Sequence, residues 1–300
     1  MKRVLFLAIV RKIWLYLLMV VLVGWVLYPG FDACIQLANP FNRSTPSMAT
    51  SHLPLHEVHF RAVDGVQLAG WLVIASPRAP TIILVHGSRG SRVDMLPWAQ
   101  FLYDAGYNVL LYDNRGCGES EGWNTTLGAR EPDDVLGAVH YLQQRSDLLL
   151  KQYGALGISL GAGVVLLAAA HEAALKAVVA DSAWVDEHTV INGMSHVGLL
   201  PLLPYEPALV DHMIGAHLED VSPLHAISLI SPRAVLLIHS ADDANRNTPL
   251  AGERQLYAQA RAPKEQWIAP NGGHVGAIDA YYHEYTSHVL SFFATFLKAA

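Results

Sequence analysis

One serine of this chain stands in a pentapeptide that favours nucleophilic chemistry. Gly157-Ile158-Ser159-Leu160-Gly161 has the pattern G-x-S-x-G and lies between an apolar run at 153–156 and an alanine-rich stretch at 162–170. This order predicts a strand, a tight turn and a helix, with the serine at the turn. The two glycines lack a Cβ, so the backbone can turn sharply and present the serine oxygen clear of the sheet. We therefore expect Ser159 to be a nucleophile.

A serine hydroxyl is a poor nucleophile near neutral pH, so it needs a base within reach and a third group that orients this base. Gly272 and Gly273 precede His274 after the predicted last strand, and they free a loop to bring the imidazole over the sheet edge. Asp242 and Asp243 follow another predicted strand, and a loop there reaches the same edge. The sequence predicts His274 as the general base and one of the two aspartates as the orienting acid.

The negative charge that develops on an attacked carbonyl oxygen needs N–H donors that are already in position. His86-Gly87-Ser88-Arg89-Gly90 follows the apolar run at 81–85 and has the form H-G-x-x-G of a loop that supplies such donors. We expect the backbone N–H groups of Ser88 and of Leu160, the residue after the nucleophile, to form the oxyanion hole.

Strand-like and helix-like stretches alternate from His56 onward, which is typical of a mostly parallel, twisted sheet with helices on both faces. An antiparallel hairpin is predicted at 56–61 and 66–74, around Asp64-Gly65. The remaining strands are predicted at 81–85, 108–112, 153–156, 177–180, 234–238 and 265–268, and helices at 96–104, 131–144 and 281–297. Short segments with Pro, Gly and His break the pattern at about 185–233, where we expect a small apolar cap insertion.

The first thirty residues differ in kind from the rest. An uninterrupted apolar run at 13–28 follows Lys2, Arg3, Arg11 and Lys12 and is closed by Pro29-Gly30. This pattern predicts a single transmembrane helix, and the basic residues before it favour a cytoplasmic N-terminus with the remainder outside. A cleaved signal peptide has the same charge order, but no small-x-small site follows closely, so an uncleaved signal anchor is favoured. The predicted organisation is an anchor at 1–30, a linker at 31–54 and a catalytic domain at 55–300.

Composition excludes several classes of partner. The net charge is −6, and the lysines and arginines are scattered, so no basic surface for a nucleic acid is expected. The two cysteines, Cys34 and Cys117, are too few for a disulfide scaffold and lack metal-ligand spacing. The spacing of the histidines in the predicted cap does not match a metal site either. We expect neither a metal nor a cofactor.

Taken together, these motifs resemble those of the α/β-hydrolases, in the branch of the serine aminopeptidase-like, monoacylglycerol-lipase-like and membrane-anchored α/β-hydrolase-domain proteins. The resemblance covers the chain from His56 to its C-terminus and rests on His86-Gly87, Asp113-Asn114-Arg115-Gly116-Cys117-Gly118-Glu119-Ser120, the segment 157–161, Asp181-Ser182, Asp220-Val221-Ser222-Pro223-Leu224 and Gly273-His274. It implies an α/β-hydrolase fold in which the segment 113–120 is a structural turn.

The acid loop departs from the family pattern. In the family H-G-x-x-D is common, whereas this chain has His239-Ser240-Ala241-Asp242-Asp243 and a longer stretch before Pro249. By the family's spacing Asp243 aligns with the acid. Asp242 remains the runner-up, and Asp181 is a more remote alternative.

The expected function is that of a serine hydrolase that forms an acyl-enzyme on Ser159 from an ester, a thioester or an amide. Esterase or lipase-like chemistry is favoured, and the predicted apolar cap and membrane anchor suggest lipophilic acyl substrates. Two alternatives remain open. One is an acyltransferase that uses the same triad, and the other is a catalytically silent, membrane-tethered binding protein on the hydrolase fold.

Overall fold

A computed structural model of the chain describes residues 2–37, 52–186, 206–217 and 220–297. In these residues eight strands form one sheet in the order β1-β2-β4-β3-β5-β6-β7-β8. The strands are β1 (His56–Arg61), β2 (Gln67–Val73), β3 (Thr81–Val85), β4 (Asn108–Tyr112), β5 (Tyr153–Ile158), β6 (Leu175–Asp181), β7 (Ala234–Ser240) and β8 (Lys264–Ala269). β1 and β2 form the predicted hairpin, β2 pairs antiparallel with β4, and all other neighbours are parallel. The predicted mostly parallel sheet is confirmed.

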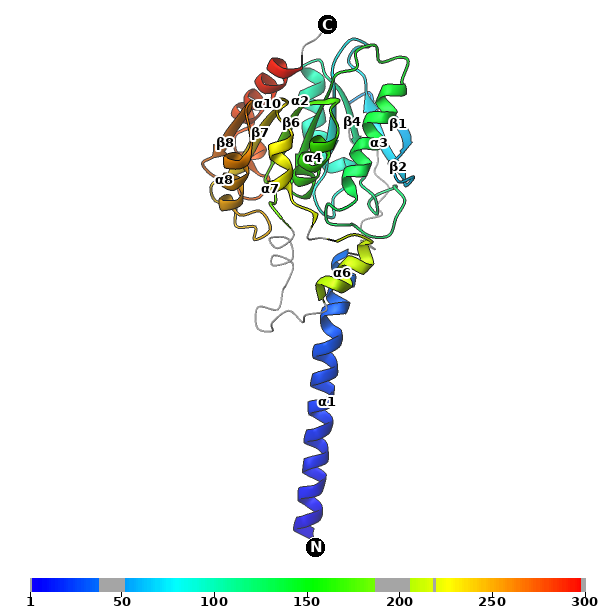
Figure 1. Cartoon of the computed structure of the whole chain (residues 1–300), viewed down its shortest axis with the longest axis vertical. Helices are drawn as coiled ribbons and strands as arrows, with labels where there is room; N and C mark the ends of the chain where they lie inside the picture. The colour runs from blue at the N-terminus through cyan, green and yellow to red at the C-terminus, as the bar shows by residue number, and fades with distance from the viewer. Residues whose placement is uncertain (1, 38–51, 187–205, 218–219, 298–300) are drawn as a thin grey trace.

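Helices cover both faces of the sheet (Figure 1). They are α1 (Lys2–Leu37), α2 (Leu96–Asp104), α3 (Glu131–Gln144), α4 (Leu160–His171), α6 (Glu206–Ile214), α7 (Pro223–Ala226), α8 (Leu250–Gln259), α9 (Ala277–Ala280) and α10 (Tyr282–Phe296), with short 3-10 turns η2 (Arg92–Met95) and η4 (Ile227–Leu229). Strands β3 to β7 are buried on both sides, because α3 and α4 pack on one face and α2 and α10 on the other. Continuous apolar runs such as Thr81–Val85 are the sequence signature of such strands.

The parallel strands give the sheet two distinct edges. We call the loops that follow the strands β3 to β8 the carboxyl edge, and the loops that precede those strands, together with the end of α10, the amino edge. The chain turns into α4 at the carboxyl edge directly after β5, and Ser159 is the N-cap residue of that helix. Groups at the carboxyl edge of parallel strands converge, which is why binding sites of open α/β sheets lie there.

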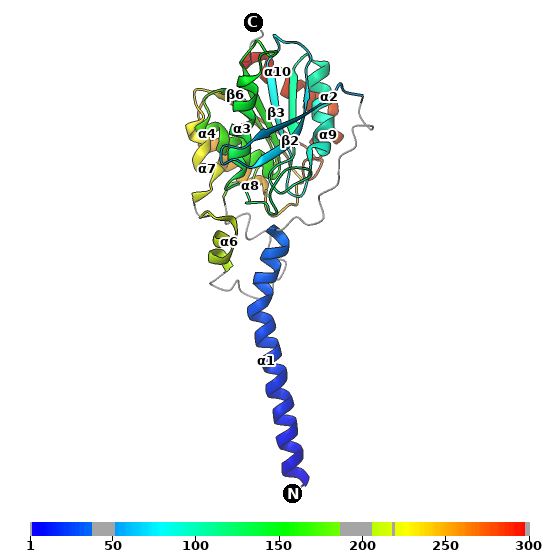
Figure 2. The same ribbon diagram turned by 90° about the vertical axis from the view of Figure 1, so that its right-hand side faces the viewer.

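Helix α1 stands out from the body of the molecule (Figures 1 and 2). Its stretch Ile9–Tyr28 is long and apolar enough to cross a membrane, and none of it is buried against the rest of the chain. The sequence indicates that the helix ends at Pro29-Gly30. In the structure it continues to Leu37. The predicted linker at 31–54 therefore begins inside a helix, and its residues 38–51 lie outside the described residues.

The described part of the predicted cap consists of short helices. α6 packs beside the end of α1, and α7 and η4 lie against α4. The apolar stretch that suggested an acyl-sized pocket, residues 199–204, lies outside the described residues.

Candidate active site

Ser159 has a backbone conformation that residues with a side chain rarely adopt. Its φ is 54° and its ψ is −117°, in a region that costs free energy for any residue with a Cβ. The neighbouring glycines are needed because a Cβ on Gly157 would lie 2.1 Å from the Gly161 carbonyl oxygen, and one on Gly161 would lie 2.3 Å from that of Val85. The G-x-S-x-G pattern thus forms a strained turn from β5 into α4, as the sequence predicts.

Three of the residues predicted from the sequence are joined by hydrogen bonds. The Ser159 hydroxyl lies 2.8 Å from Nε2 of His274, and Nδ1 of the same ring lies 2.9 Å from Oδ2 of Asp243. The His274 side chain is 29 % exposed, whereas the Asp243 carboxylate is fully buried. The serine–imidazole end therefore faces solvent and the imidazole–carboxylate end is shielded from it. In this order a histidine can take the serine proton while the carboxylate holds the ring.

Several groups hold the buried carboxylate of Asp243. Its Oδ1 accepts a hydrogen bond from the Asn245 N–H at 2.8 Å, and its Oδ2 lies 3.3 Å from the Thr248 hydroxyl. On another side Nε2 of the fully buried His239 lies 3.5 Å from the same Oδ2. Burial pushes the pKa of Asp243 up, but the hydrogen bonds from His274 and Asn245 outweigh it and leave the pKa below its ordinary value. Burial lowers the pKa of His239, which favours the neutral ring.

The runner-up acid has a different partner. Oδ1 of Asp242 accepts a hydrogen bond from the Gly273 N–H at 2.9 Å, so this side chain ties the glycine loop that carries His274. Two neighbouring carboxylates thus contact the same loop, one at the backbone and one at the imidazole. Sequence reasoning did not find His239 or Thr248. For His239 the available signal was its position four residues before Asp243.

Asp181, the remote alternative, lies buried beneath the elbow and does not contact His274. Its backbone carbonyl accepts the Ser159 N–H at 2.9 Å, and its carboxylate accepts hydroxyl hydrogen bonds from Tyr285 at 2.9 Å and Ser182 at 3.0 Å. Burial raises its pKa to about 6, against the effect of these hydrogen bonds. The Ser182 hydroxyl also accepts the N–H of Val275, the residue after His274. Asp181 therefore connects the backbone of the elbow with the histidine loop.

The loop predicted to carry an oxyanion donor lies beside the nucleophile. A Cβ on Gly87 would lie 3.2 Å from Cβ and 3.7 Å from Oγ of Ser159. Ser88, the next residue, is exposed at the start of a tight turn, and Leu160 occupies the first turn of α4, where N–H groups have no partner within the helix. The loop is fixed by the buried His86, whose Nε2 accepts the N–H of Asn114 at 3.0 Å.

The segment 113–120 makes structural contacts. The buried carboxylate of Asp113 accepts the N–H groups of Arg92 at 2.7 Å and Glu119 at 3.0 Å. Arg115 forms ion pairs with Asp134 at 2.6 Å and Asp64 at 2.7 Å. These contacts join the loop after β4 to the start of α3 and to the β1–β2 hairpin, and none of them involves Ser159 or His274. This agrees with the structural turn that the family resemblance implies.

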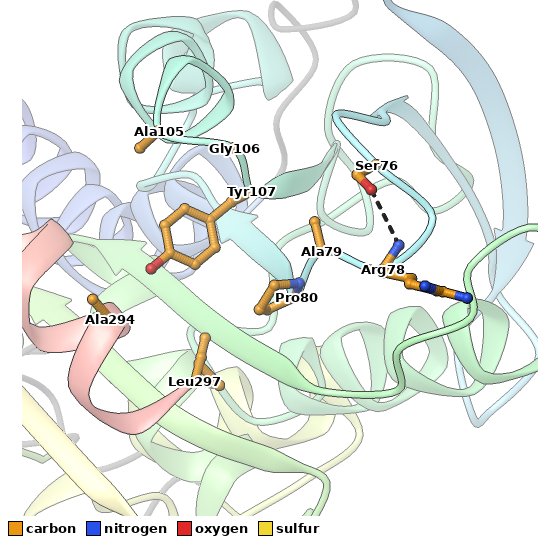
Figure 3. A pocket seen from close by; sticks show the side chains of 9 residues that line it. All are labelled: Ser76, Arg78, Ala79, Pro80, Ala105, Gly106, Tyr107, Ala294 and Leu297. Atoms are coloured by element: carbon orange, nitrogen blue, oxygen red, sulfur yellow. Dashed lines mark hydrogen bonds between the residues drawn. The ribbon is translucent and has the colours of Figure 1, made fainter. Parts of the chain in front are cut away.

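A cavity of about 390 Å³ lies at the amino edge (Figure 3), and Ser159 is not among the residues that line it. Ser76, Pro80, Tyr107 and Leu297 line it, with the exposed Ala294 of α10 at its rim. The cavity contains no pair of groups arranged as a nucleophile and its base. Within the described ranges there is also no group of three or more His, Cys, Asp or Glu side chains placed to hold a metal ion.

Comparisons with known proteins bear on the family and the fold of this chain. The family model of the X-Pro dipeptidyl-peptidases (S15 family) matches residues 34–202, which is more than half of the chain. The chain is similar to the uncharacterized protein YfhR of Salmonella typhimurium, with 29 % identity over 95 % of this chain and 96 % of that protein. It is also similar to the polyketide transferase grgF of a Penicillium species, with 34 % identity over 46 % of this chain and 48 % of that protein.

Among solved structures, the esterase Pf2001 of Pyrococcus furiosus superposes with a TM-score of 0.73 at 25 % identity, covering 87 % of this chain and 98 % of the esterase. This similarity confirms the predicted α/β-hydrolase fold. The chain is therefore a hydrolase of the esterase and peptidase type, and it belongs to the X-Pro dipeptidyl-peptidase (S15) family of the α/β-hydrolase superfamily.

Proposed function

We propose that this protein is a serine hydrolase that cleaves carboxylic esters through an acyl-enzyme on Ser159. The observation that carries the proposal is the continuous hydrogen-bonded series from the Ser159 hydroxyl through His274 to the buried Asp243. His274 takes the serine proton as Oγ attacks the carbonyl carbon, and Asp243 stabilises the imidazolium that forms. The N–H groups of Ser88 and Leu160 stabilise the oxyanion, and no cofactor or metal takes part in these steps.

His274 then gives its proton to the departing alcohol oxygen, which leaves the acyl group on Ser159. Water enters, loses a proton to His274 and attacks the acyl carbon, so that a carboxylic acid is released and the serine is restored. Ester cleavage is favoured over peptide cleavage by the similarity to the esterase Pf2001, whereas the family match favours release of X-Pro dipeptides. The rates of hydrolysis of a p-nitrophenyl ester and of an X-Pro p-nitroanilide distinguish ester cleavage from dipeptide release.

Fluorophosphonate labelling and ester hydrolysis test the nucleophile. For Ser159→Ala we expect no labelling and a loss of kcat on the order of 10⁴-fold or more with p-nitrophenyl butyrate. Ser291→Ala is the matched control, because Ser291 is exposed on α10, and it should label and hydrolyse as the wild type does. Hydrolysis that survives in Ser159→Ala would rule out this serine as the nucleophile. The absence of both labelling and turnover in the folded wild type would instead favour the silent binding protein.

Acyl transfer is the second candidate, and the similarity to the polyketide transferase grgF favours it. The acyl-enzyme is the same, and only the acceptor differs, because an alcohol or a thiol replaces water. Product analysis with candidate acceptors at millimolar concentration distinguishes the two. Acid release that exceeds acyl transfer at every acceptor concentration supports the hydrolase.

We also propose that Ile9–Tyr28 anchors the protein in a membrane with the N-terminus in the cytoplasm and the body outside. Lys2 and Arg3 before the span, and Arg11 and Lys12 in its first turn, support this orientation. Modification of a cysteine placed at the exposed Val63 by an impermeant maleimide, applied to intact cells, should occur if the body is outside. Modification only after lysis would show that the body lies in the cytoplasm.

A further inference from the structure

The anchor helix joins the body at the carboxyl edge, where Ser159 lies. The carbonyl of Leu37, the last residue of α1, accepts the N–H of Thr125 at 3.0 Å, in the loop between β4 and α3. The Leu37 side chain is fully buried in the apolar core that α3 and α4 share. In both views α1 leaves the body on the side opposite to the C-terminus, which follows α10 at the amino edge (Figures 1 and 2).

A short series of contacts connects this attachment point with the nucleophile. Gly128, three residues after Thr125, packs on Trp184 so closely that a Cβ would lie 2.5 Å from the indole. The indole N–H of Trp184 in turn donates to the carbonyl of Leu160 at 3.1 Å. The end of the anchor and the start of α4 are therefore held by one packed set of side chains.

The length of α1 sets how far the carboxyl edge can lie from the bilayer. The apolar span ends at Tyr28, and the segment from there to Leu37 adds about 13 Å of helix at 1.5 Å per residue. The headgroup layer on each side of a bilayer is about 5–8 Å thick. With the helix perpendicular to the membrane, the carboxyl edge thus faces the bilayer and lies about 5–8 Å beyond its headgroup layer.

An exposed tryptophan lies next to the attachment point. Trp123 is 57 % exposed and stands two residues before Thr125. Tryptophan is enriched at the membrane–water interface, where its apolar ring and polar N–H match the headgroup layer. Leu149, which is 62 % exposed, lies before β5 at the amino edge and serves as the comparison.

We propose that the substrate of Ser159 is an acyl ester lipid that the enzyme takes from the membrane in which α1 is embedded. A site that faces the headgroup layer across this short distance suits an amphiphile whose ester bond lies at the junction of headgroup and acyl chain. This inference rests on the proposed serine hydrolase. Ser159 Oγ forms the bond to the acyl carbon, the lipid alcohol leaves with the proton from His274, and water releases the fatty acid.

Full-length protein in phosphatidylcholine vesicles allows a test with two esters of the same leaving group. 4-Methylumbelliferyl oleate partitions into the vesicles, and 4-methylumbelliferyl acetate stays in water. Insertion of Ala-Glu-Ala-Ala-Lys-Ala-Glu after Gly30 should lift the body by about 10 Å and turn it by only about 20°, because seven residues are close to two helical turns. We expect oleate hydrolysis to fall about tenfold relative to acetate hydrolysis.

The same seven residues inserted after Lys2 lengthen the helix on the other side of the span and should change neither rate. Trp123→Ala should lower the oleate-to-acetate ratio about threefold, and Leu149→Ala should leave it unchanged. If the lifted variant keeps the wild-type ratio, or if the wild type cleaves acetate but not vesicle-borne oleate, the membrane substrate is excluded while the hydrolase stands. If fluorophosphonate does not label Ser159, the proposed function itself fails.

Discussion

The two edges of the sheet differ in backbone strain. Among the described residues, five non-glycine residues have a positive φ, namely Arg89, Leu127, Ser159, Ser182 and Val275, and each lies in a loop at the carboxyl edge. The amino edge has none of these but contains the cavity of about 390 Å³. Strained backbone persists only where the surroundings hold it in place, and such positions cluster at functional sites. The comparison teaches that the candidate chemistry lies where strained backbone and buried charge gather, and that the cavity at the amino edge lies away from both.

The charges follow the same division. Asp243, Asp181 and His239 are all fully buried at the carboxyl edge, within or directly after strands β6 and β7. Burying a charge costs free energy unless hydrogen bonds or an opposite charge compensate, and Asp181 and Asp243 accept such bonds from neighbouring residues. If the carboxyl edge carries the activity, substitutions there should have graded effects on it, and matched changes at the amino edge should have none.

After Ser159, the largest effect is expected from the acid. Asp243→Asn keeps the shape of the side chain but removes the charge that holds the His274 tautomer, and we expect kcat to fall on the order of 10³- to 10⁴-fold. Asp242→Asn should cost less than about tenfold, because its oxygen can still accept the Gly273 N–H. Steady-state kinetics with a p-nitrophenyl ester measures both. Equal losses in the two variants would contradict the assignment of the acid.

The next effect concerns the loop beside the nucleophile. Gly87→Ala adds a methyl group 3.7 Å from the Ser159 oxygen and 3.2 Å from its Cβ, so the loop or the serine must shift by a few tenths of an ångström. Misplaced donors cost about 10- to 100-fold in kcat. Fluorophosphonate labelling should slow in parallel. Gly65→Ala is the control at the hairpin turn, where nothing lies within 4 Å of the added Cβ, although its positive φ can lower the melting temperature. A kcat for Gly87→Ala equal to that of the control would show that this loop does not shape the site.

Much of this arrangement could be predicted from the sequence, and particular residues show why the rest could not. The strand at Thr81–Val85 was predictable because a short, continuous apolar run is typical of a strand that is buried on both faces. The elbow was predictable because the pattern G-x-S-x-G places a glycine at both positions where a Cβ would collide with a backbone carbonyl, that of Gly161 or that of Val85. Neighbouring aspartates in an irregular loop were not separable by residue type, and only the family spacing favoured Asp243.

The extent of α1 was misjudged for a physical reason. Pro29 and Gly30 are strong helix-ending signals, yet the helix continues to Leu37, whose side chain packs into the core of the body. Tertiary packing outweighed local propensity here, and no pattern in residues 1–54 reports on a contact with Thr125. The roles of Tyr285 and Ser182 beneath the elbow were also out of reach, because they depend on hydrogen bonds between segments far apart in the sequence.

A smaller effect, on stability rather than activity, should come from Glu253 in the first turn of α8. This side chain is fully buried, and burial raises its pKa to about 8, against a weak hydrogen bond from Gln266. Since the ordinary value is 4.5, the folded state holds a proton that the unfolded state loses between these two values. The contribution of this protonated side chain to the free energy of unfolding is fully present below about pH 4.5. It declines as the pH rises and is lost as the pH passes through about 8.

Glu253→Gln removes this titration. We expect the variant and the wild type to melt at similar temperatures near pH 5. By pH 9 the free energy of unfolding of the variant should exceed that of the wild type by up to about 4 kcal/mol. Thermal unfolding of the full chain in detergent, followed by tryptophan fluorescence across this range, measures the difference. Glu265→Gln, at an exposed position of β8, is the control. A constant difference between Glu253→Gln and the wild type at all pH values would show that the pKa of Glu253 is the same in the folded and unfolded states.

The smallest effect is expected at the amino edge, and its absence is informative. Ala294→Leu places a larger apolar side chain at the rim of the cavity from an exposed position on α10, so it needs no shift of the core. We expect kcat and KM with soluble and vesicle-borne esters to stay within about twofold of the wild type and stability within about 0.5 kcal/mol, as for other surface substitutions. Because α10 also carries Tyr285, which donates to Asp181, a change in KM without a change in melting temperature would mean that the cavity communicates with the carboxyl edge. That single result would remove the contrast between the two edges, since space at one edge would then matter to chemistry at the other.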